Sequence, residues 1–171
     1  VGLFDYNTKV TNFDGTFYYC DDLTEIPAGL FDNNTKVTSF HSTFSKCESL
    51  TTIPTGLFDS CIEVTTFHGT FYYCKSLQAI PVGLFDNNTK VTKFSKTFTE
   101  CSNLKEIPEG LFDYNTKVTD FGGVFSFCTK LTGESPYTTI NVDGVDTKVH
   151  LYERTNHSSY FTKPTTYYYC F

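Results

Sequence analysis

The stretch Cys20–Cys47, CDDLTEIPAGLFDNNTKVTSFHSTFSKC, contains one complete unit of a repeat and the first residue of the next unit. The motif GLFD recurs along the chain at intervals of 27 residues, without insertions. A cysteine keeps the same period, at Cys20, Cys47, Cys74, Cys101 and Cys128. A unit of this length cannot bury its own apolar side chains, whereas stacked neighbours form one continuous core. The repeat therefore predicts a solenoid.

The spacing inside the unit excludes a long helix. Apolar residues stand three apart in LxxI and VTxF, and Pro and Gly interrupt the pattern, so no helical stripe is sustained. We expect two short extended segments, joined by a turn at PxGLFDxNT and by a tight helical or 3₁₀ turn at TFxxC that directs Phe44 and Cys47 inward. The predicted fold class is an all-β-rich repeat of about five 27-residue coils with short strands and short helical turns.

The C-terminal segment departs from the repeat. Asp143-Gly144 lies between β-rich flanks, so residues 138–152 are predicted to form a β-hairpin. The motif TYYYC at 166–170 then resembles TFYYC of the coils. We therefore expect a solenoid over 1–135, a hairpin-containing insertion over 136–165 that packs on or projects from the last coil, and the start of a further coil over 166–171.

Composition limits the classes of partner. The chain has 171 residues, 13 Lys and Arg against 19 Asp and Glu, a net charge of −6 and no basic tract. This balance argues against nucleic-acid binding, because a phosphate backbone needs a positive surface. No apolar run is long enough to cross a bilayer, so membrane insertion is not expected. The absence of Met and the start inside a motif indicate a piece of a longer or processed polypeptide, with neither end capped.

The unit CxxLxxIPxGLFDxNTKVTxFxxTFxxC resembles the BspA-like leucine-rich repeats of bacterial surface proteins, particularly those of gut Bacteroidota and their phages. The resemblance covers about residues 1–135 and recurs at 166–171. It implies a curved leucine-rich-repeat solenoid at the cell surface, outside the cell, with a role in adhesion and no catalytic residues to transfer. The unit is longer than the commonest unit of that family and has Phe where relatives often carry Met or Ala.

The cysteines have several interpretations. For the register cysteines a small, inert, buried side chain is favoured, because no CxxC pair that could hold zinc is present. Cys61 replaces the Asn found at this turn position in the other units, where we expect it to be exposed. Neutral drift and an intermolecular disulfide at Cys61 are the two alternatives, since an exposed free thiol can pair between chains.

Enzyme chemistry and cofactors are not expected. The Asp of each GLFD motif could suggest a cation ladder, yet a turn cap is the simpler interpretation, because no calcium loop accompanies it. His41 and His68 share one column, and no hydrolase, metalloprotease or nucleotide-binding motif is present. We therefore predict no catalytic residue, no metal site and no cofactor.

Equivalent positions of successive units form columns. The columns that vary between units predict a recognition surface. Apolar columns hardly change, whereas the columns around His41 and Lys93 and the pair before each register Cys change freely. Positions fixed by packing face the core, so the variable positions should face water. Tyrosine pairs there suit stacking on sugars or packing against protein. The alternative is that these tyrosines lie flat over neighbouring side chains and shield the edge of the coil. The candidate ligand-binding residues are Tyr18, Tyr19, His41, His68, Tyr72, Tyr73 and Lys93.

Two functions follow from this pattern. The first is a non-enzymatic extracellular recognition or adhesion module that binds a host protein, a glycan or a cell surface through the variable face. The second is a structural protein whose copies stack into a filament, a virion component or a surface appendage, because uncapped repeats present heterologous ends. The partner is then a protein or glycan ligand, or copies of the chain itself.

Overall fold

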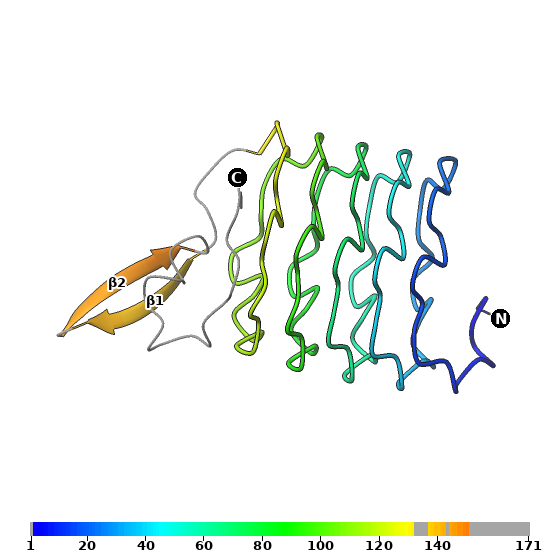
Figure 1. Cartoon of the computed structure of the whole chain (residues 1–171), viewed down its shortest axis with the longest axis horizontal. Helices are drawn as coiled ribbons and strands as arrows, with labels where there is room; N and C mark the ends of the chain where they lie inside the picture. Colours follow the sequence, from blue (N-terminus) through cyan, green and yellow to red (C-terminus); the bar gives the residue numbers. More distant parts are fainter. Residues whose placement is uncertain (1, 132–136, 143, 151–171) are drawn as a thin grey trace.

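The computed structural model describes residues 2–131, 137–142 and 144–150. Residues 2–131 wind into stacked coils, one for each repeat, and the stack runs along the long axis of Figure 1. One residue of each VTxF segment forms a parallel bridge to the same residue of the next coil, and these residues are Asn12, Ser39, Thr66, Lys93 and Asp120. The repeat thus builds a solenoid, as the sequence predicts.

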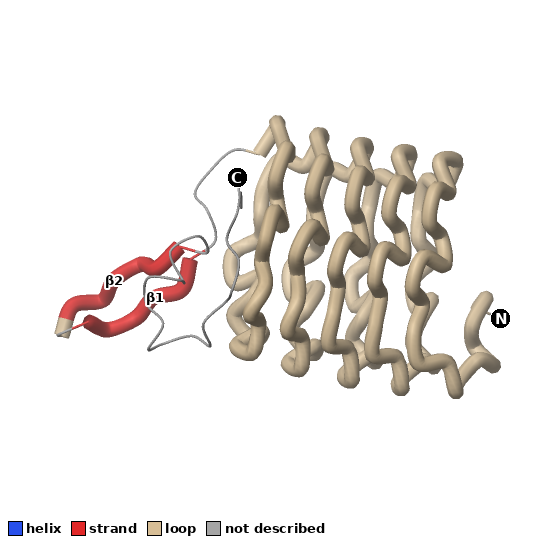
Figure 2. Tube along the Cα trace, in the orientation of Figure 1, coloured by secondary structure: helices blue, strands red, loops and turns tan. Residues whose placement is uncertain are grey.

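The coils contain turns where short strands and helical turns were predicted, and this part of the prediction is wrong for residues 2–131 (Figure 2). The reason is an alternation of backbone hydrogen bonds. The N–H groups of Phe13 and Phe17 donate to the next coil at 3.0 and 2.8 Å, whereas that of Thr16 donates back to Phe13 at 3.1 Å. Since successive residues bond in different directions, neither a strand ladder nor a helix extends.

The interior consists of three phenylalanine ladders. Ring centroids in the first ladder are 6.0–6.2 Å apart, in the second 5.6–5.9 Å and in the third 5.2–5.5 Å. The ladders are Phe4, Phe31, Phe58, Phe85 and Phe112; Phe13, Phe40, Phe67, Phe94 and Phe121; and Phe17, Phe44, Phe71, Phe98 and Phe125. Burial of these rings supplies most of the driving force for stacking.

The spacing of the ladders shows how the stack bends. Rings of one ladder are nearly parallel, within 15°, so their separation follows the distance between coils at that point. Coils are closest beside the third ladder, where backbone N–H groups reach carbonyls of the next coil directly. They are farthest apart at the first ladder, beside the GLFD turns. The bend therefore places the TFxxC turns and the variable columns on its inner side.

The C-terminal element is a two-stranded antiparallel hairpin. Strand β1 spans Tyr137–Val142 and strand β2 spans Val145–His150, and Val142 pairs with Val145 across the turn. Gly144 in this turn has a φ of 86°, a region that glycine adopts without strain. The end of the predicted hairpin beyond residue 150, most of the predicted insertion over 136–165 and the predicted coil over 166–171 lie outside the described residues.

A membrane-spanning helix was not expected. Over the ranges 2–131, 137–142 and 144–150, no helix has the length and apolar character needed to cross a bilayer.

Candidate ligand-binding surface

The residue before each register Cys adopts a left-handed backbone conformation. We call these five positions the left-handed column; their φ values are 60–64° and none of them is glycine. Such a conformation costs a residue with a side chain about 1–2 kcal/mol. The TFxxC turn ends at this residue and directs the chain back into the core at the register Cys. This turn offsets the strain. The column comprises Tyr19, Lys46, Tyr73, Glu100 and Phe127.

A second left-handed position lies four residues earlier in each coil. Three of its five members are glycines, at 15, 69 and 123, and the others are Ser42 and Lys96. The contrast between the two columns is informative, because the same backbone constraint is met by glycine in one and by aromatic or charged residues in the other. The side chains of the left-handed column are therefore accommodated in spite of the strain.

The variable columns enclose a first hollow of about 490 Å³, which we call the histidine groove. It brings together three of the predicted site residues, His41, His68 and Lys93, and it is closed at one end by Asp120. The two imidazole rings meet edge to face, with centroids 5.0 Å apart. The structure thus brings these three residues of successive coils onto one surface. The expectation that the variable positions face water is wrong for four small residues of the same columns, which are buried: Ser45, Ser95, Thr99 and Ser126.

A second hollow of about 470 Å³, the central groove, adjoins the first and shares His68 and Asp120 with it. Tyr72, a predicted site residue, lines the central groove together with Glu100 and Phe127. The groove exists because the last coils have small residues where earlier coils have His and Tyr. The floor is formed by Ser95, Thr99, Gly122, Gly123 and Ser126.

Hydrogen bonds hold the polar groups of the central groove. The Tyr72 hydroxyl donates to Glu100 Oε1 at 3.2 Å, and His68 Nδ1 lies 2.6 Å from Ser95 Oγ. The backbone N–H of Gly122 donates to Asp120 Oδ1 at 3.0 Å. Groups fixed in this way lose little entropy when a ligand binds. The groove is thus a preformed polar site with one exposed aromatic ring, Phe127.

The surroundings of two groups on this surface shift their pKa values. Burial lowers the pKa of His68 from its ordinary value, and the neighbouring charge of His41 lowers it further. Burial also raises the pKa of Tyr72, and the Glu100 carboxylate beside it acts in the same direction. His68 therefore favours its neutral form, and the Tyr72 hydroxyl keeps its proton.

The other predicted site residues form a row with lysines. The ammonium of Lys46 is 5.8 Å from the ring centroid of Tyr18 and 5.0 Å from that of Tyr19. Lys75 lies 4.2 Å from the ring centroid of Tyr73. These distances are those of cation–π contacts. The Tyr73 ring is also 5.8 Å from the ring of Tyr72 between centroids, so this tyrosine row adjoins the central groove.

A third hollow of about 360 Å³, the edge groove, lies beyond the central groove and shares Glu100 and Phe127 with it. Sequence reasoning singled out neither of these residues, nor Asp120, as a site residue. The available signal was their place in the variable columns, because Glu100 and Phe127 occupy the same column as Tyr19 and Tyr73. Their joint role depends on the small floor residues, which only the structure places beneath them.

Cys61 is buried, and its predicted exposure is wrong. Its side chain is 0% exposed, and Sγ lies 3.8 Å from the carbonyl oxygen of Phe31 and 3.7 Å from that of Asn34. Burial raises the pKa of the Cys61 thiol to about 12. An intermolecular disulfide at Cys61 would require the coil to open. The residue faces inward as Asn34, Asn88 and Asn115 of the same column do, whereas Asn7 in the first coil is exposed.

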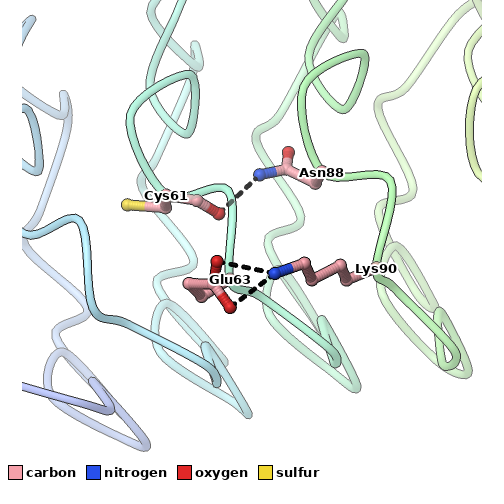
Figure 3. Close-up of polar contacts among 4 residues, drawn as sticks. All are labelled: Cys61, Glu63, Asn88 and Lys90. Atoms are coloured by element: carbon pink, nitrogen blue, oxygen red, sulfur yellow. Dashed lines mark hydrogen bonds and ion pairs between the residues drawn. The ribbon is translucent and has the colours of Figure 1, made fainter.

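The equivalent asparagines show what that column does. Asn88 Nδ2 donates to the carbonyls of Phe58 and Cys61 in the preceding coil, at 3.1 and 3.0 Å (Figure 3). Asn34 and Asn115 make the same pair of bonds one coil back. Coils are far apart on this side, so a side-chain amide spans a gap that a backbone N–H cannot. The column is a structural ladder and not a surface feature.

An ion pair lies on the exposed side of the turns that contain Cys61 and Asn88. Glu63 interrupts the lysine column, and its two carboxylate oxygens accept hydrogen bonds from Lys90 Nζ at 2.6 and 2.7 Å (Figure 3). Both side chains are nearly half exposed, so the pair contributes about 0.2–1 kcal/mol.

The register cysteines are buried from Cys47 onward, and Cys20 is exposed. The thiol of Cys74 donates to the carbonyl of Phe44 in the preceding coil at 3.1 Å, and burial raises its pKa well above the ordinary value. These properties are those of inert core thiols. In the described residues the cysteines from Cys47 to Cys128 thus act as part of the coil-to-coil packing.

The aspartates of the GLFD motif lie over the start of their own turn. Gly2 N–H donates to Asp5 Oδ2 at 2.6 Å, and a Cβ on Gly29 would come within 2.9 Å of Asp32 Oδ2. Burial and the charges of neighbouring aspartates raise the pKa of Asp86. Among the residues that the structure describes, no group of three or more His, Cys, Asp or Glu side chains is arranged to hold a metal ion.

Comparison with known proteins gives one family. The family described as "Mycoplasma protein of unknown function, DUF285" matches residues 2–109 and 56–164. The comparison with curated proteins finds no match.

Several solved structures are similar in part. The leucine-rich repeat domain of APL1B is 20% identical, with a TM-score of 0.47, over 66% of this chain and 29% of that one. TLR13, solved in a complex with ssRNA13, is 14% identical, with a TM-score of 0.46, over 75% and 19%. A leucine-rich repeat protein from Eubacterium ventriosum is 20% identical, with a TM-score of 0.30, over 82% and 40%. The chain thus spans well under half of each, and with TM-scores below 0.5 the fold rests on its own coils.

Proposed function

Because the chain belongs to the DUF285 family, whose function is unknown, we propose from its own coils that it is a non-enzymatic recognition module that binds a ligand through its variable face. The observation that carries this proposal is the pair of adjoining grooves on the inner side of the bend, where the variable columns gather. Solenoids bind macromolecules through such concave surfaces. The ligand would be a protein, a glycan or a cell surface.

The polar groups of the central groove support a recognition role, because they are held in place by neighbours. The Glu100 carboxylate and the His68 ring are each engaged by a neighbouring hydroxyl, of Tyr72 and Ser95 respectively. The resemblance to bacterial surface repeats supports a location outside the cell, with adhesion as the biological role.

The test compares two sets of tyrosine variants on protein and glycan arrays. Replacement of Tyr18, Tyr19, Tyr72 and Tyr73 by Ser removes aromatic area from the variable face. Replacement of Tyr6 and Tyr114 by Ser removes exposed aromatic area from the turns after GLFD and serves as the matched control. We expect a ligand of the wild-type chain to be lost only by the first set.

Equal binding by both sets would contradict the assignment of the variable face. Loss of binding by the Tyr6 and Tyr114 control alone would place the ligand on the outer side of the bend instead. Circular dichroism of each variant ensures that a loss of binding is not a loss of fold.

A further inference from the structure

We propose that the central groove and the edge groove bind a neutral oligosaccharide, an inference that rests on the proposed recognition function and names its ligand class. The two grooves share Glu100 and Phe127, so one extended ligand can occupy both. Volumes of about 470 and 360 Å³ are in the range of small-ligand sites, about 300–1,000 Å³.

Charge balance favours a neutral ligand. Glu100, Asp120 and Lys96 all line the central groove, and Lys93 lies in the adjoining histidine groove. The surface therefore offers neither a net positive field for a polyanion nor a strong negative field for a basic peptide. The chain as a whole, with a net charge of −6, repels polyanions.

The aromatic rings suit the apolar faces of sugars. Phe127 is 70% exposed on the ridge between the two grooves, and Tyr72 lines the central groove. A pyranose ring has a C–H face that packs on an aromatic ring and a rim of hydroxyl groups that hydrogen-bond. Phe127 keeps its ring although its backbone has a φ of 60°, which glycine would adopt without strain.

The polar groups suit a rim of hydroxyl groups. The Glu100 carboxylate accepts one bond from Tyr72, and a carboxylate has further lone pairs for hydroxyl donors. His68, Ser95 and Ser126 add groups that can donate or accept. Since these side chains are held in place before binding, their hydrogen bonds can discriminate between arrangements of hydroxyl groups.

The backbone gives little support to a peptide ligand. A peptide that adds as a strand needs unpaired backbone N–H and C=O groups at an edge. On this surface the N–H of Lys96 donates to Gly122 and that of Glu100 donates to Ser126, at 2.9 and 2.8 Å. The coils therefore use these groups among themselves, and recognition depends on side chains.

Calorimetric titration of the full chain with a fixed set of probes tests the proposal. The neutral probes are cellohexaose, laminarihexaose, maltohexaose, xylohexaose, mannohexaose and chitohexaose. A heparin hexasaccharide and hexalysine represent polyanions and basic peptides. We expect submillimolar binding of at least one neutral probe and weaker or no binding of the two charged probes.

Two variants and one control locate the binding. Phe127→Ala removes the exposed ring, and Glu100→Gln removes the charge but keeps an acceptor for Tyr72. Each should weaken binding of the neutral probe at least tenfold. Tyr114→Ala, an exposed aromatic residue of the same coil on the outer side, should leave binding unchanged. Thermal unfolding of the variants controls for loss of fold.

The outcomes separate this inference from the proposed function. Absence of binding to every neutral probe, or equal binding by wild type, Phe127→Ala and Glu100→Gln, overturns the oligosaccharide assignment. A protein ligand that is lost by the tyrosine variants of the variable face would leave the recognition function intact in that case. Tight binding of heparin or hexalysine would also overturn the assignment and would identify a charged ligand.

Discussion

At the scale of single residues, the asparagine column shows how a side chain can replace a backbone bond. Asn88 joins two coils through two bonds from one amide, whereas Cys61, at the same position one coil earlier, has only its thiol, 3.7–3.8 Å from the same kind of acceptor. A thiol is a weak donor. The carbonyls of Phe31 and Asn34 are therefore the least well bonded of those facing this column.

This difference predicts the effect of exchanging the two residues. Asn88→Cys removes two hydrogen bonds from buried carbonyls and should lower the free energy of unfolding by about 1–3 kcal/mol. Cys61→Asn should change it by less than about 1 kcal/mol, because the two new bonds are offset by burial of an amide oxygen that has no hydrogen-bond partner at the equivalent asparagines. Urea denaturation followed by circular dichroism measures both changes.

Asn87→Cys is the control, because Asn87 is the exposed neighbour of Asn88. Its effect should stay within about 0.5 kcal/mol, as for other surface substitutions. If Asn88→Cys were no more destabilising than Asn87→Cys, the column would have no structural role.

The inward direction of this column could not be predicted from the sequence. The turn PxGLFDxNT contains several polar residues in succession, so no hydrophobic period shows which of them points into the core. Exposure of Cys61 was predicted on that basis and was wrong. The apolar columns gave a clear signal, since Phe44 and Cys47 face inward as expected.

At the scale of elements, each complete coil contains three left-handed turn positions, the glycine of GLFD and two positions around TFxxC, where a helical turn was predicted. The extended segments LxxI and VTxF could be identified from β-rich spacing, yet only one bridge per coil forms in VTxF. Residue spacing reports which side chains are buried. It does not report whether successive N–H groups bond to the same neighbour, and that condition defines a strand.

Glycine should stabilise the left-handed positions where the chain has another residue. Ser42→Gly and Lys96→Gly, at φ values of 54° and 57°, should each raise the free energy of unfolding by about 1 kcal/mol, because the left-handed strain is removed. The other coils already have glycine at the equivalent position. Thermal unfolding of the two variants measures the gain.

Lys93→Gly provides a control of opposite sign. Lys93 is exposed and is not among the residues with positive φ, so glycine there adds only backbone freedom to the unfolded chain. We expect a loss of about 0.5–1 kcal/mol. Destabilisation by Lys96→Gly as well would show that the Lys96 side chain contributes more than the strain costs.

At the scale of the whole molecule, the stability of the fold should depend on pH through His68. The ring is packed among His41, Ser95 and the charged groups of Lys93, Lys96 and Asp120. Burial lowers its pKa below the unfolded value, so the unfolded chain binds more protons near and below pH 6.5. The stabilisation that neutral His68 provides is complete above the pKa of His68 in the unfolded chain. It is lost as the pH falls through the pKa of His68 in the folded chain.

The midpoint of thermal unfolding should therefore decrease between pH 7.5 and 5.5, and His68→Gln should make this decrease smaller. Comparison of wild type and variant at each pH isolates His68 from the carboxylates, whose effects lie at lower pH. Equal slopes for the two proteins would show that protonation of His68 is not coupled to folding.

The solenoid could be predicted from the 27-residue period, and the columns that hold His41, His68 and Lys93 were identified from the contrast between variable and constant positions. The grooves could not, because they depend on the small residues of the last coils, such as Gly122 and Gly123, beneath side chains from other coils. Four predicted residues, His41, His68, Tyr72 and Lys93, line the grooves. Glu100, Asp120 and Phe127 could be recognised only once the coils were stacked.

Because the three phenylalanine ladders differ in spacing, every coil is thinner on the inner side of the bend than on the outer side. The stack therefore has a preferred radius of curvature. A ligand that spans several coils on the inner side meets that radius as a fixed template. A straighter ligand must pull the inner edges apart, which stretches the backbone bonds of about 2.8–3.0 Å between coils. A ligand of matching curvature avoids this cost. Under the proposed recognition function, the solenoid would therefore select ligands by shape as well as by chemistry.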